Sequence, residues 1–391
     1  MSATHQSLTA LFAGTAPQAW SDQQVRAFLR HLFNEGVASA QPAQVLAQYL
    51  PVKPKGRCVV VGAGKASAAM AAALEAAWPD VPLEGVVITR DGHAVPTQHI
   101  TILEASHPVP DARSVQAGRA LLKAVEGLRP DDLVVALISG GGSSLLALPV
   151  DGMTLEEKSQ IGKDLLHSGA TITEMNTVRR HLSAIKGGRL AQAAYPARVA
   201  TFVMSDVPGD DPAVIASGPT VASPTTAQDA LRIVEKYDIT LPESAYNFLK
   251  QHNKETETKE EKINPENSLH MIATPFMALQ AIATCAAHYG VTPLILGDAL
   301  EGESRSVGVA LSGIAHSAKR HNVPVKAPAV LLSGGEATVT IRKGENAGRG
   351  GGVIQNFYCP VHKLYKVRQE YGPLQEIVMA LMAQKMPLVP L

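Results

Sequence analysis

Three apolar segments of this chain run directly into glycine-rich turns, and the first turn carries a lysine. Residues 58–61 (Cys-Val-Val-Val) lead into the turn Gly62–Ala66, which contains Lys65 and opens an alanine-rich helix. Two further turns, Ser139–Ser144 and Ser333–Glu336, follow apolar segments in the same way. Backbone N–H groups at such turns and helix starts attract anions, and a lysine adds a full positive charge. The pattern favours an enzyme that handles phosphate.

Short β-type segments alternate with helical segments along most of the chain. Strands are predicted at 57–61, 85–89, 100–104, 132–138 and 199–205, and helices at 22–48, 65–77, 112–127, 154–169, 173–183 and 226–236. This alternation is typical of an α/β fold with a parallel sheet covered on both faces. Ligands bind beyond the carboxyl ends of the strands in such sheets, and the glycine turns follow those ends.

A charged segment divides the chain. Residues 251–268 are rich in Asn, Glu and Lys and almost free of apolar side chains, so an exposed linker or loop is predicted there. A second series follows, with strands predicted at 269–273, 292–296, 328–333 and 336–342 and helices at 276–289 and 303–319. Because 391 residues favour two domains, the predicted domains are 1–250 and 269–391.

Composition excludes several function classes. The formal net charge is zero and aromatic residues make up 4%, which argues against nucleic acid, an anionic membrane or a base-stacking surface as partner. The three cysteines are far apart and form neither a metal-ligand spacing nor a disulfide framework. No signal peptide and no apolar run of membrane-spanning length is recognised. We therefore expect a cytoplasmic protein; its oligomeric state is not indicated.

The first two glycine turns, Gly62–Ala66 and Ser139–Ser144, do not match standard sequence motifs. The first is too short for a Walker A loop, and Ser67 stands where a dinucleotide fingerprint has its third glycine. The alternative to an anion-binding role for the turn Gly62–Ala66 is a tight strand-to-helix connection. The turn Ser139–Ser144 is not a nucleophile elbow, because its serines follow the glycines. It is predicted to be a nest of N–H groups for an oxyanion, and the alternative is a close-packed turn.

Charged residues suggest further parts of a site. Asn176, Arg179 and Arg180 share one face of a predicted helix, and Lys186 follows in a turn, which suits polyphosphate or carboxylate as well as a solvated basic surface. Asp206 follows strand 199–205 and is suited to bind Mg²⁺ or to act as a general base, although turns favour Asp in any case.

Two loops have competing interpretations. His107 lies between serine and proline in a stiff loop; it either reaches the site or belongs, with Asp111, to a helix cap, and the cap is favoured. Arg349 lies in a glycine run that is either a linker or an anion clamp.

Taken together, the motifs resemble one family. They are Gly62-Ala-Gly-Lys-Ala, Ser106-His-Pro-Val-Pro-Asp, Ser139-Gly-Gly-Gly-Ser-Ser, Asn176-Thr-Val-Arg-Arg-His-Leu-Ser, Ile185-Lys-Gly-Gly-Arg, Ser205-Asp-Val-Pro-Gly-Asp, Ile215-Ala-Ser-Gly-Pro-Thr, Gly297-Asp-Ala-Leu-Glu-Gly-Glu and Leu332-Ser-Gly-Gly-Glu. This ordered set, over about residues 10 to 351, resembles the class II glycerate 2-kinases with a C-terminal MOFRL domain.

The resemblance implies ATP- and Mg²⁺-dependent phosphorylation of D-glycerate to 2-phosphoglycerate. It implies a Rossmann-like N-terminal domain, a smaller MOFRL-like C-terminal domain and a site in the cleft between them. Family knowledge makes Lys65 and Arg349 essential. The other assignments are ours: Asp206 is catalytic or, with Asp210, a metal ligand, and the nucleotide or substrate is held by Gly62, Gly64, Ser139, Gly140, Gly141, Gly142, Ser143, Asn176, Arg180, Lys186, Ser333, Gly334, Gly335 and Glu336.

The C-terminal part departs from this family. From Gly352 onward the sequence does not continue with the expected Arg-Asn helix and acidic loop, so an incomplete second domain is expected. Two alternatives to the kinase therefore remain. One is an NAD(P)H-dependent hydroxypyruvate reductase, which the altered dinucleotide fingerprint disfavours; the other is a ligand-binding protein without activity.

Overall fold

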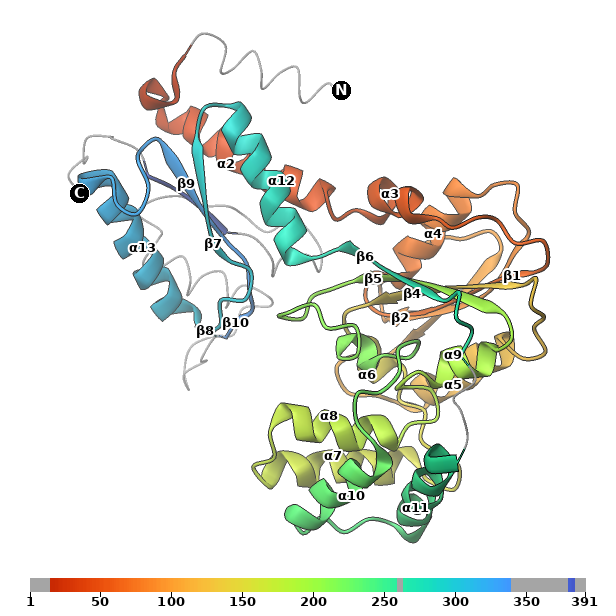
Figure 1. Ribbon diagram of the computed structural model, residues 1–391. Coiled ribbons are helices and arrows are strands. Elements are labelled where there is room, and N and C mark those ends of the chain that lie inside the picture. The colour runs from red at the N-terminus through yellow and green to blue at the C-terminus, as the bar shows by residue number, and fades with distance from the viewer. Residues whose placement is uncertain (1–14, 259–262, 339–378, 384–391) are drawn as a thin grey trace. The chain divides into compact units, whose positions relative to one another are not determined.

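The computed structural model describes residues 15–258, 263–338 and 379–383 of the chain (Figure 1). Its contacts group the residues into two compact units. One unit consists of residues 42–272, and the other joins 1–41 to 273–391. No helix in these described ranges is long and apolar enough to cross a membrane.

A six-stranded sheet forms the centre of the unit 42–272. The strand order is β3-β2-β1-β4-β5-β6, and the pairings from β3 to β5 are all parallel. The strands are β1 Cys58–Ala63, β2 Leu83–Arg90, β3 Ile100–Ala105, β4 Leu133–Ser139, β5 Arg198–Met204 and β6 Ser268–Ala273. This is the order of the doubly wound dinucleotide-binding fold, in which ligands bind where the order reverses, beside the ends of β1 and β4. The predicted α/β class and the first five strands are confirmed.

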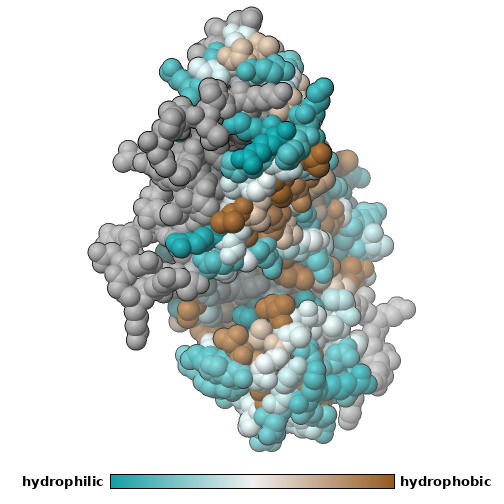
Figure 2. Space-filling model, turned by 90° about the vertical axis from the view of Figure 1, so that its left-hand side faces the viewer, coloured by the Kyte–Doolittle hydropathy of each residue, from teal (hydrophilic) through white to brown (hydrophobic). Residues whose placement is uncertain are grey.

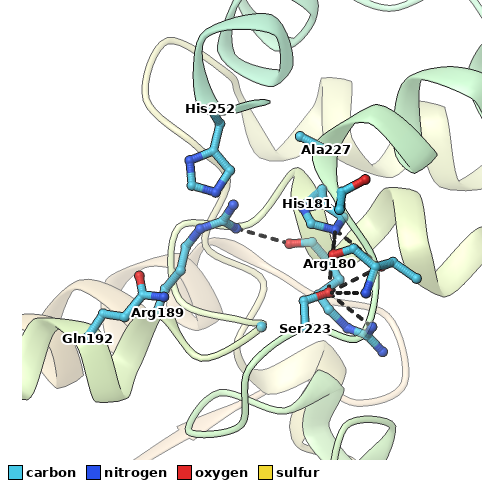
Figure 3. A pocket seen from close by; sticks show the side chains of 10 residues that line it. Arg180, His181, Arg189, Gln192, Ser223, Ala227 and His252 are labelled. Carbon is cyan, nitrogen blue, oxygen red and sulfur yellow. Dashed lines mark hydrogen bonds between the residues drawn. The ribbon is translucent and has the colours of Figure 1, made fainter. Parts of the chain in front are cut away.

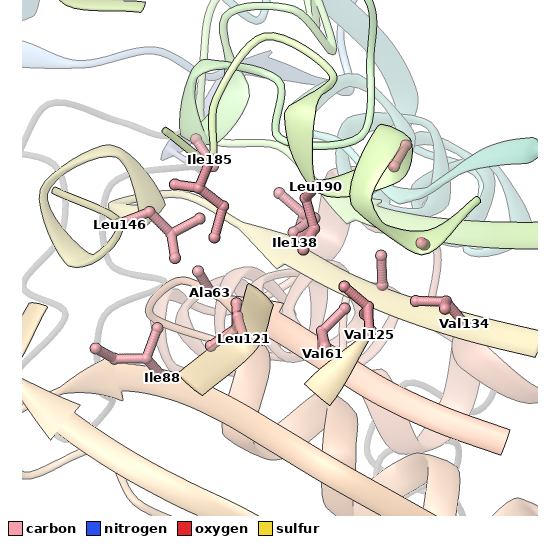
Figure 4. Packing of buried hydrophobic residues seen from close by; sticks show 14 of the residues in the cluster. Val61, Ala63, Ile88, Leu121, Val125, Val134, Ile138, Leu146, Ile185 and Leu190 are labelled. Carbon is pink, nitrogen blue, oxygen red and sulfur yellow. The ribbon is translucent and has the colours of Figure 1, made fainter. Parts of the chain in front are cut away.

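The two central strands are buried on both faces. Every residue of β1 and β4 is buried, as expected for apolar runs inside a parallel sheet. Alternate side chains such as Val61, Ala63 and Ile138 form one cluster with Leu121 and Val125 (Figure 4). The last two belong to α5 (Ala112–Ala124) or follow it directly. Packing on both faces fixes where β1 and β4 end, and therefore where their turns lie.

Helices complete this unit. Beside α5, the sheet is accompanied by α3 Pro42–Val45, η2 Leu46–Tyr49, α4 Ser67–Ala77, α6 Gly142–Leu145 and α9 Arg189–Ala194. Asp111 caps α5, since its carboxylate accepts the Arg113 N–H at 3.0 Å. The cap interpretation of Asp111 is therefore confirmed.

A separate group of helices has its own apolar core. It contains α7 Leu155–His167, α8 Ile172–His181, α10 Ala227–Lys236 and α11 Glu243–Thr258, which lie together at the lower end of Figure 1. Three of them begin with capping boxes, headed by Thr154, Thr171 and Thr226, which satisfy otherwise unpaired N–H groups. The surface of this end is mainly hydrophilic in Figure 2.

The second unit is built around a three-stranded sheet. Its order is β11-β9-β7, with β7 and β9 parallel and β11 antiparallel, and β8 pairs with β10. The elements are η1 Pro17–Ala19, α2 Asp22–Ala38, α12 Pro275–His288, β7 Thr292–Gly297, β8 Gly302–Glu303, α13 Ser304–His321, β9 Ala329–Ser333, β10 Ala337–Thr338 and β11 Met379–Ala383. Phe28 and Leu32 of α2 pack with Ile282 of α12 and Val330 of β9.

The grouping differs in three places from the predicted boundaries 1–250, 251–268 and 269–391. Residues 1–41 join the second unit, because α2 buries its apolar face against α12 and β9. Strand β6, expected in the second domain, extends the six-stranded sheet. Helix α11 continues to Thr258, into the predicted linker, because the Lys- and Glu-rich sequence there contains no Gly or Pro to end it.

Asp132 is expected to stabilise the amino-terminal edge of the central strands. Its buried carboxylate accepts the N–H groups of Arg57 and Arg129, both at 2.7 Å. Asp132→Ala leaves both donors without a partner and should lower the free energy of unfolding by about 2 kcal/mol, measured by urea denaturation. The exposed neighbour Asp131 provides a matched control, since Asp131→Ala should change stability by less than about 0.5 kcal/mol. Equal effects of the two substitutions would contradict this role.

Candidate active site

The first glycine turn is tied to the end of β4. The Lys65 N–H donates to Gly140 O at 2.9 Å, and the Ala66 N–H donates to Ser139 Oγ at 3.0 Å. Gly64 allows this approach, because at its φ of +142° a Cβ would lie 2.1 Å from Ser139 Oγ. The sequence predicts that N–H groups of this turn cradle an anion, but these two donate within the protein. What the turn offers a ligand is therefore the Lys65 ammonium.

The second turn retains free donors. Gly141 adopts a φ of +79°, and neither the Gly140 nor the Gly141 N–H has an acceptor among the described residues. A Cβ on Gly140 would lie 1.9 Å from Asp206 Oδ2, so only glycine leaves space for that carboxylate. Two unpaired N–H groups at the end of a buried strand are donors of the kind that hold an oxyanion, and the expectation that this turn binds one stays a prediction.

Lys65 reaches across this turn to Asp206, which follows β5. The Lys65 Nζ lies 3.3 Å from Asp206 Oδ2, and the two side chains are 20% and 29% exposed. The ends of β1, β4 and β5 thus bring together an ammonium, two free N–H groups and a carboxylate. A partly exposed ion pair of this kind can open when an anion replaces the carboxylate beside the lysine.

His107 belongs to the same group of residues, although the sequence favours a cap role for it. A Cβ on Gly141 would lie 2.9 Å from His107 Nε2 and 3.1 Å from Lys65 Cγ. Burial, followed by the positive charges of Lys65 and Arg90, lowers the pKa of His107, and Asp206 partly opposes them. The imidazole is therefore neutral at pH 7 and able to accept a proton. The motif Ser-His-Pro signals a stiff loop but not the direction of the ring.

Arg90 and His93 also approach this end of the sheet, and the sequence gives no signal for either. Arg90 ends β2, and its Nε donates to His93 Nε2 at 2.6 Å. Burial is the main cause that lowers the pKa of His93, followed by the charge of Arg90.

The buried side chain of Lys186 binds the backbone of the second turn, Ser139–Ser144. Its side chain is only 3% exposed, and its Nζ donates to Ser143 O at 2.7 Å. Burial, reinforced by Arg179 and Arg180, lowers the pKa of Lys186 to about 7. The sequence predicts an exposed cation for phosphate, whereas the structure shows a buried support beneath Ser143.

The loop that faces Ser143 has a strained backbone. Ala216, Ser217 and Gly218 have φ values of +52°, +62° and +58° in succession, in or beside η3 (Ile215–Ser217). Ser217 Oγ lies 2.9 Å from Ser143 Oγ. The carbonyls of Ser217 and Gly218 accept N–H groups from the Lys186 turn, at 3.1 and 2.8 Å. Non-glycine residues adopt this conformation at a cost of about 1–3 kcal/mol each, and such strain is concentrated at functional sites.

The other predicted ligands of this unit are placed elsewhere or have structural roles. Gly62 lies inside β1, where a Cβ would approach Leu137 O to 2.5 Å, and Gly142 begins α6. Asn176 is half-buried on α8. Arg180 lines a cavity whose lining includes neither Lys65 nor Asp206 (Figure 3).

Two carboxylates follow β5 in the sequence, and their assignment to Mg²⁺ stays a prediction. Asp210 Oδ1 is buried and has no partner among the described residues, and Asp206 provides a second carboxylate. The described residues contain no group of three or more His, Cys, Asp or Glu side chains suited to a metal. Mg²⁺ commonly binds through one or two carboxylates together with water and substrate phosphates, so this donor set is consistent with such a site.

The third glycine turn lies in the second unit. Ser333 ends β9, the Gly334 N–H donates to Gly297 O at 2.9 Å, and Gly335 packs against Leu300. The expectation that Ser333, Gly334, Gly335 and Glu336 bind nucleotide or substrate stays a prediction. Arg349 and the atypical segment from Gly352 to residue 378 lie outside the described residues.

Comparison with known proteins decides the family. A family model described as "Domain of unknown function (DUF4147)" matches residues 28–250. D-glycerate 2-kinase of Thermotoga maritima is 37% identical over 319 residues, which cover 81% of this chain and 75% of that protein. The chain belongs to the glycerate kinase family.

The family includes proteins with two kinds of name. A "Putative hydroxypyruvate reductase" of Agrobacterium vitis is 57% identical over 338 residues, covering 86% of this chain and 76% of that protein. The crystal structure of glycerate kinase from Thermotoga maritima superposes with a TM-score of 0.77 at 34% identity, covering 86% of this chain and 80% of that one. The family fold is thus shared by this chain.

The buried Lys186 should make stability depend on pH. Because its pKa is about 7 in the folded protein and about 10.4 in an unfolded chain, the unfolded state binds more protons between these values. The free energy of unfolding should therefore rise by about 2 kcal/mol from pH 7 to 9. This rise should be smaller in Lys186→Met and unchanged in Lys163→Met, which alters an exposed lysine of α7. Denaturant titrations at several pH values test this, and identical slopes in all three proteins would refute it.

Proposed function

We propose that this chain is a glycerate 2-kinase, which transfers the γ-phosphoryl group of ATP to the 2-hydroxyl of D-glycerate. The observation that carries the proposal is the group formed by the Lys65 ammonium, the free N–H groups of Gly140 and Gly141 and the Asp206 carboxylate. Phosphoryl transfer depends on positioning and charge neutralisation rather than on covalent chemistry. This group supplies positive charge, directed donors and one proton acceptor at the end of a rigid sheet.

Each residue has a distinct task in this proposal. The Lys65 ammonium leaves Asp206 to contact the transferring phosphoryl group, where negative charge redistributes. The Gly140 and Gly141 N–H groups hold one anionic oxygen, and the Lys186–Ser143 hydrogen bond keeps their turn in place. When bound, Mg²⁺ would neutralise phosphate charge, held by Asp206 and Asp210.

The proton of the 2-hydroxyl needs an acceptor. Asp206 and His107 both lie beside Lys65, and the lowered pKa of His107 leaves its imidazole neutral. If Asp206 is engaged with a cation, His107 takes the proton; otherwise Asp206 does so directly. In either case the acceptor is part of the group around Lys65 and requires no further residue of this unit.

A hydroxypyruvate reductase is the second candidate, because a relative with that printed name is 57% identical. The strand order β3-β2-β1-β4-β5-β6 also suits a dinucleotide. Against it, the N–H groups of Lys65 and Ala66 are bonded to Gly140 and Ser139, whereas a dinucleotide fold directs its first turn to the pyrophosphate.

The ammonium of Lys65 is expected to be required for turnover. Lys65→Met keeps the length of the side chain but removes its charge, so ATP- and glycerate-dependent ADP release should fall at least about a hundredfold. Lys163→Met, at an exposed position on α7, should keep normal activity. Near-normal turnover by a folded Lys65→Met protein would exclude the proposed role.

The two candidate reactions are separated by their products. Purified chain should release ADP from ATP, Mg²⁺ and D-glycerate, and coupling to enolase should identify the phosphate on the 2-hydroxyl. Oxidation of NADH or NADPH with hydroxypyruvate, without ADP release, would instead establish the reductase. Binding of ATP with no turnover in either assay would indicate a protein that binds ligand but does not catalyse.

A further inference from the structure

A second cationic site lies beside the group of helices in the unit 42–272. It is a cavity of about 110 Å³ between the end of α8, the start of α9, the loop 221–226 and α11. Arg180, His181, Arg189 and His252 all line it, and no acidic residue is among the described residues of its lining. Figure 3 shows His252 beside Arg189, with Arg180, His181 and Ser223 grouped opposite them.

Arg180 carries a buried charge that its protein contacts satisfy only in part. The side chain is 5% exposed; Nη2 donates to Ala213 O at 2.9 Å, and Nη1 donates to Ser223 Oγ at 3.4 Å. Its Nε is buried and has no partner among the described residues. Burial lowers the pKa of Arg180 and the charge of Asp211 partly opposes this, and an arginine remains protonated in either case. Its unpaired N–H would be stabilised by an anion in the cavity.

His181 is a second buried side chain of the cavity. Its Nε2 lies 2.9 Å from Thr225 O, and because a carbonyl only accepts, this nitrogen carries the proton. Burial, followed by the charge of Arg189, lowers the pKa of His181 to about 4, and His252 and Arg180 act in the same direction. Its Nδ1 is also buried without a partner in the described part of the chain.

The backbone leaves space for a ligand. Gly187 has a φ of +63°, and a Cβ there would lie 3.1 Å from Arg180 Cγ and 3.4 Å from Ser223 Cβ. Ala227, the first residue of α10, also lines the cavity, and the start of that helix is closed by its own capping box, in which Asp229 accepts the Thr226 N–H at 2.8 Å. Residues of α8, α9, α11 and the loop 221–226 therefore surround one small volume.

We infer that this cavity binds a phosphate-sized tetrahedral oxyanion, either inorganic phosphate or the phosphate group of a small phosphomonoester. Two arginines, Arg180 and Arg189, line the cavity beside the Ser223 hydroxyl, and no carboxylate belongs to its described lining, which suits an oxyanion. The volume accommodates a phosphate group but not a nucleotide. The site is distinct from the group around Lys65, and the inference holds whichever reaction that group catalyses.

Isothermal titration of the full chain with inorganic phosphate at pH 7 tests this inference. We expect saturable binding of phosphate in this cavity that weakens as salt is added, and titrating the Lys65→Met variant as well removes the contribution of the proposed active site. Arg180→Gln and Ser223→Ala should each weaken it by about tenfold or more. Arg232→Gln, which changes an exposed arginine of α10, is the matched control and should bind as the unchanged chain does. Ser223→Ala keeps the test valid if Arg180→Gln does not fold, because Arg180 also holds Ala213 O.

The Lys65→Met variant separates this site from the proposed active site. It lacks the ammonium of the proposed active site and should still bind one phosphate in this cavity. Failure of the kinase proposal is therefore distinguishable from failure of this inference. Tighter binding of 2-phosphoglycerate than of inorganic phosphate to Lys65→Met would identify a phosphomonoester as the ligand, and equal or weaker binding would identify free phosphate. Absence of saturable binding, loss of binding in Lys65→Met, or unchanged binding in both Arg180→Gln and Ser223→Ala would overturn the inference.

Discussion

The hydrogen bonds that join the first turn to the end of β4 are the constraint on which the proposed site depends. Parallel pairing brings Ala63 beside Ile138, and the Lys65 and Ala66 N–H groups then bond to Gly140 O and Ser139 Oγ. These bonds fix the position from which the Lys65 side chain leaves the backbone. They also use the donors that a dinucleotide fold directs to pyrophosphate, which is why we propose a different ligand chemistry for the same strand order.

The basic side chains around the two proposed sites of the unit 42–272 differ in their exposure to solvent. Lys65 is partly exposed and paired with one carboxylate, which suits a group that exchanges partners during a reaction. Arg180 and Lys186 are almost fully buried and hold backbone carbonyls. The turn Lys186–Gly188 is shared, because Lys186 supports Ser143 while Gly187 packs against Arg180. One short segment thus contributes to the geometry of both proposed anion sites.

The first five strands and the positions of Lys65, Gly140 and Asp206 were largely predictable from sequence. Long apolar runs mark β1, β4 and β5, and polar or glycine residues mark their ends, so Lys65, Gly140 and Asp206 were expected at one edge of the sheet. Asp111 was expected as a cap because Asp before a helix is a common capping residue. Each of these predictions depends on local pattern, which a single sequence records well.

Predictions that depend on tertiary burial were less successful. Arg179 and Arg180 are neighbours of the same type, yet one is exposed and the other buried, and only the packing around α8 distinguishes them. A lysine in a glycine-rich turn normally indicates a solvated charge, so the burial of Lys186 left no signal. The partners of α2 and β6 lie far away in the sequence, and an apolar face does not specify which surface will cover it.

The three successive left-handed residues at 216–218 have a consequence for how ligands are recognised. Their conformation is supported by hydrogen bonds to the turn that contains Lys186 and to Ser143. If the turn Ser139–Ser144 binds the proposed oxyanion, bonds within the protein contribute to its ordering, and less entropy is lost on binding. A rigid receptor of this kind discriminates by fit, and a branched side chain at Ala216 or Ser217 would be disfavoured on conformational grounds alone.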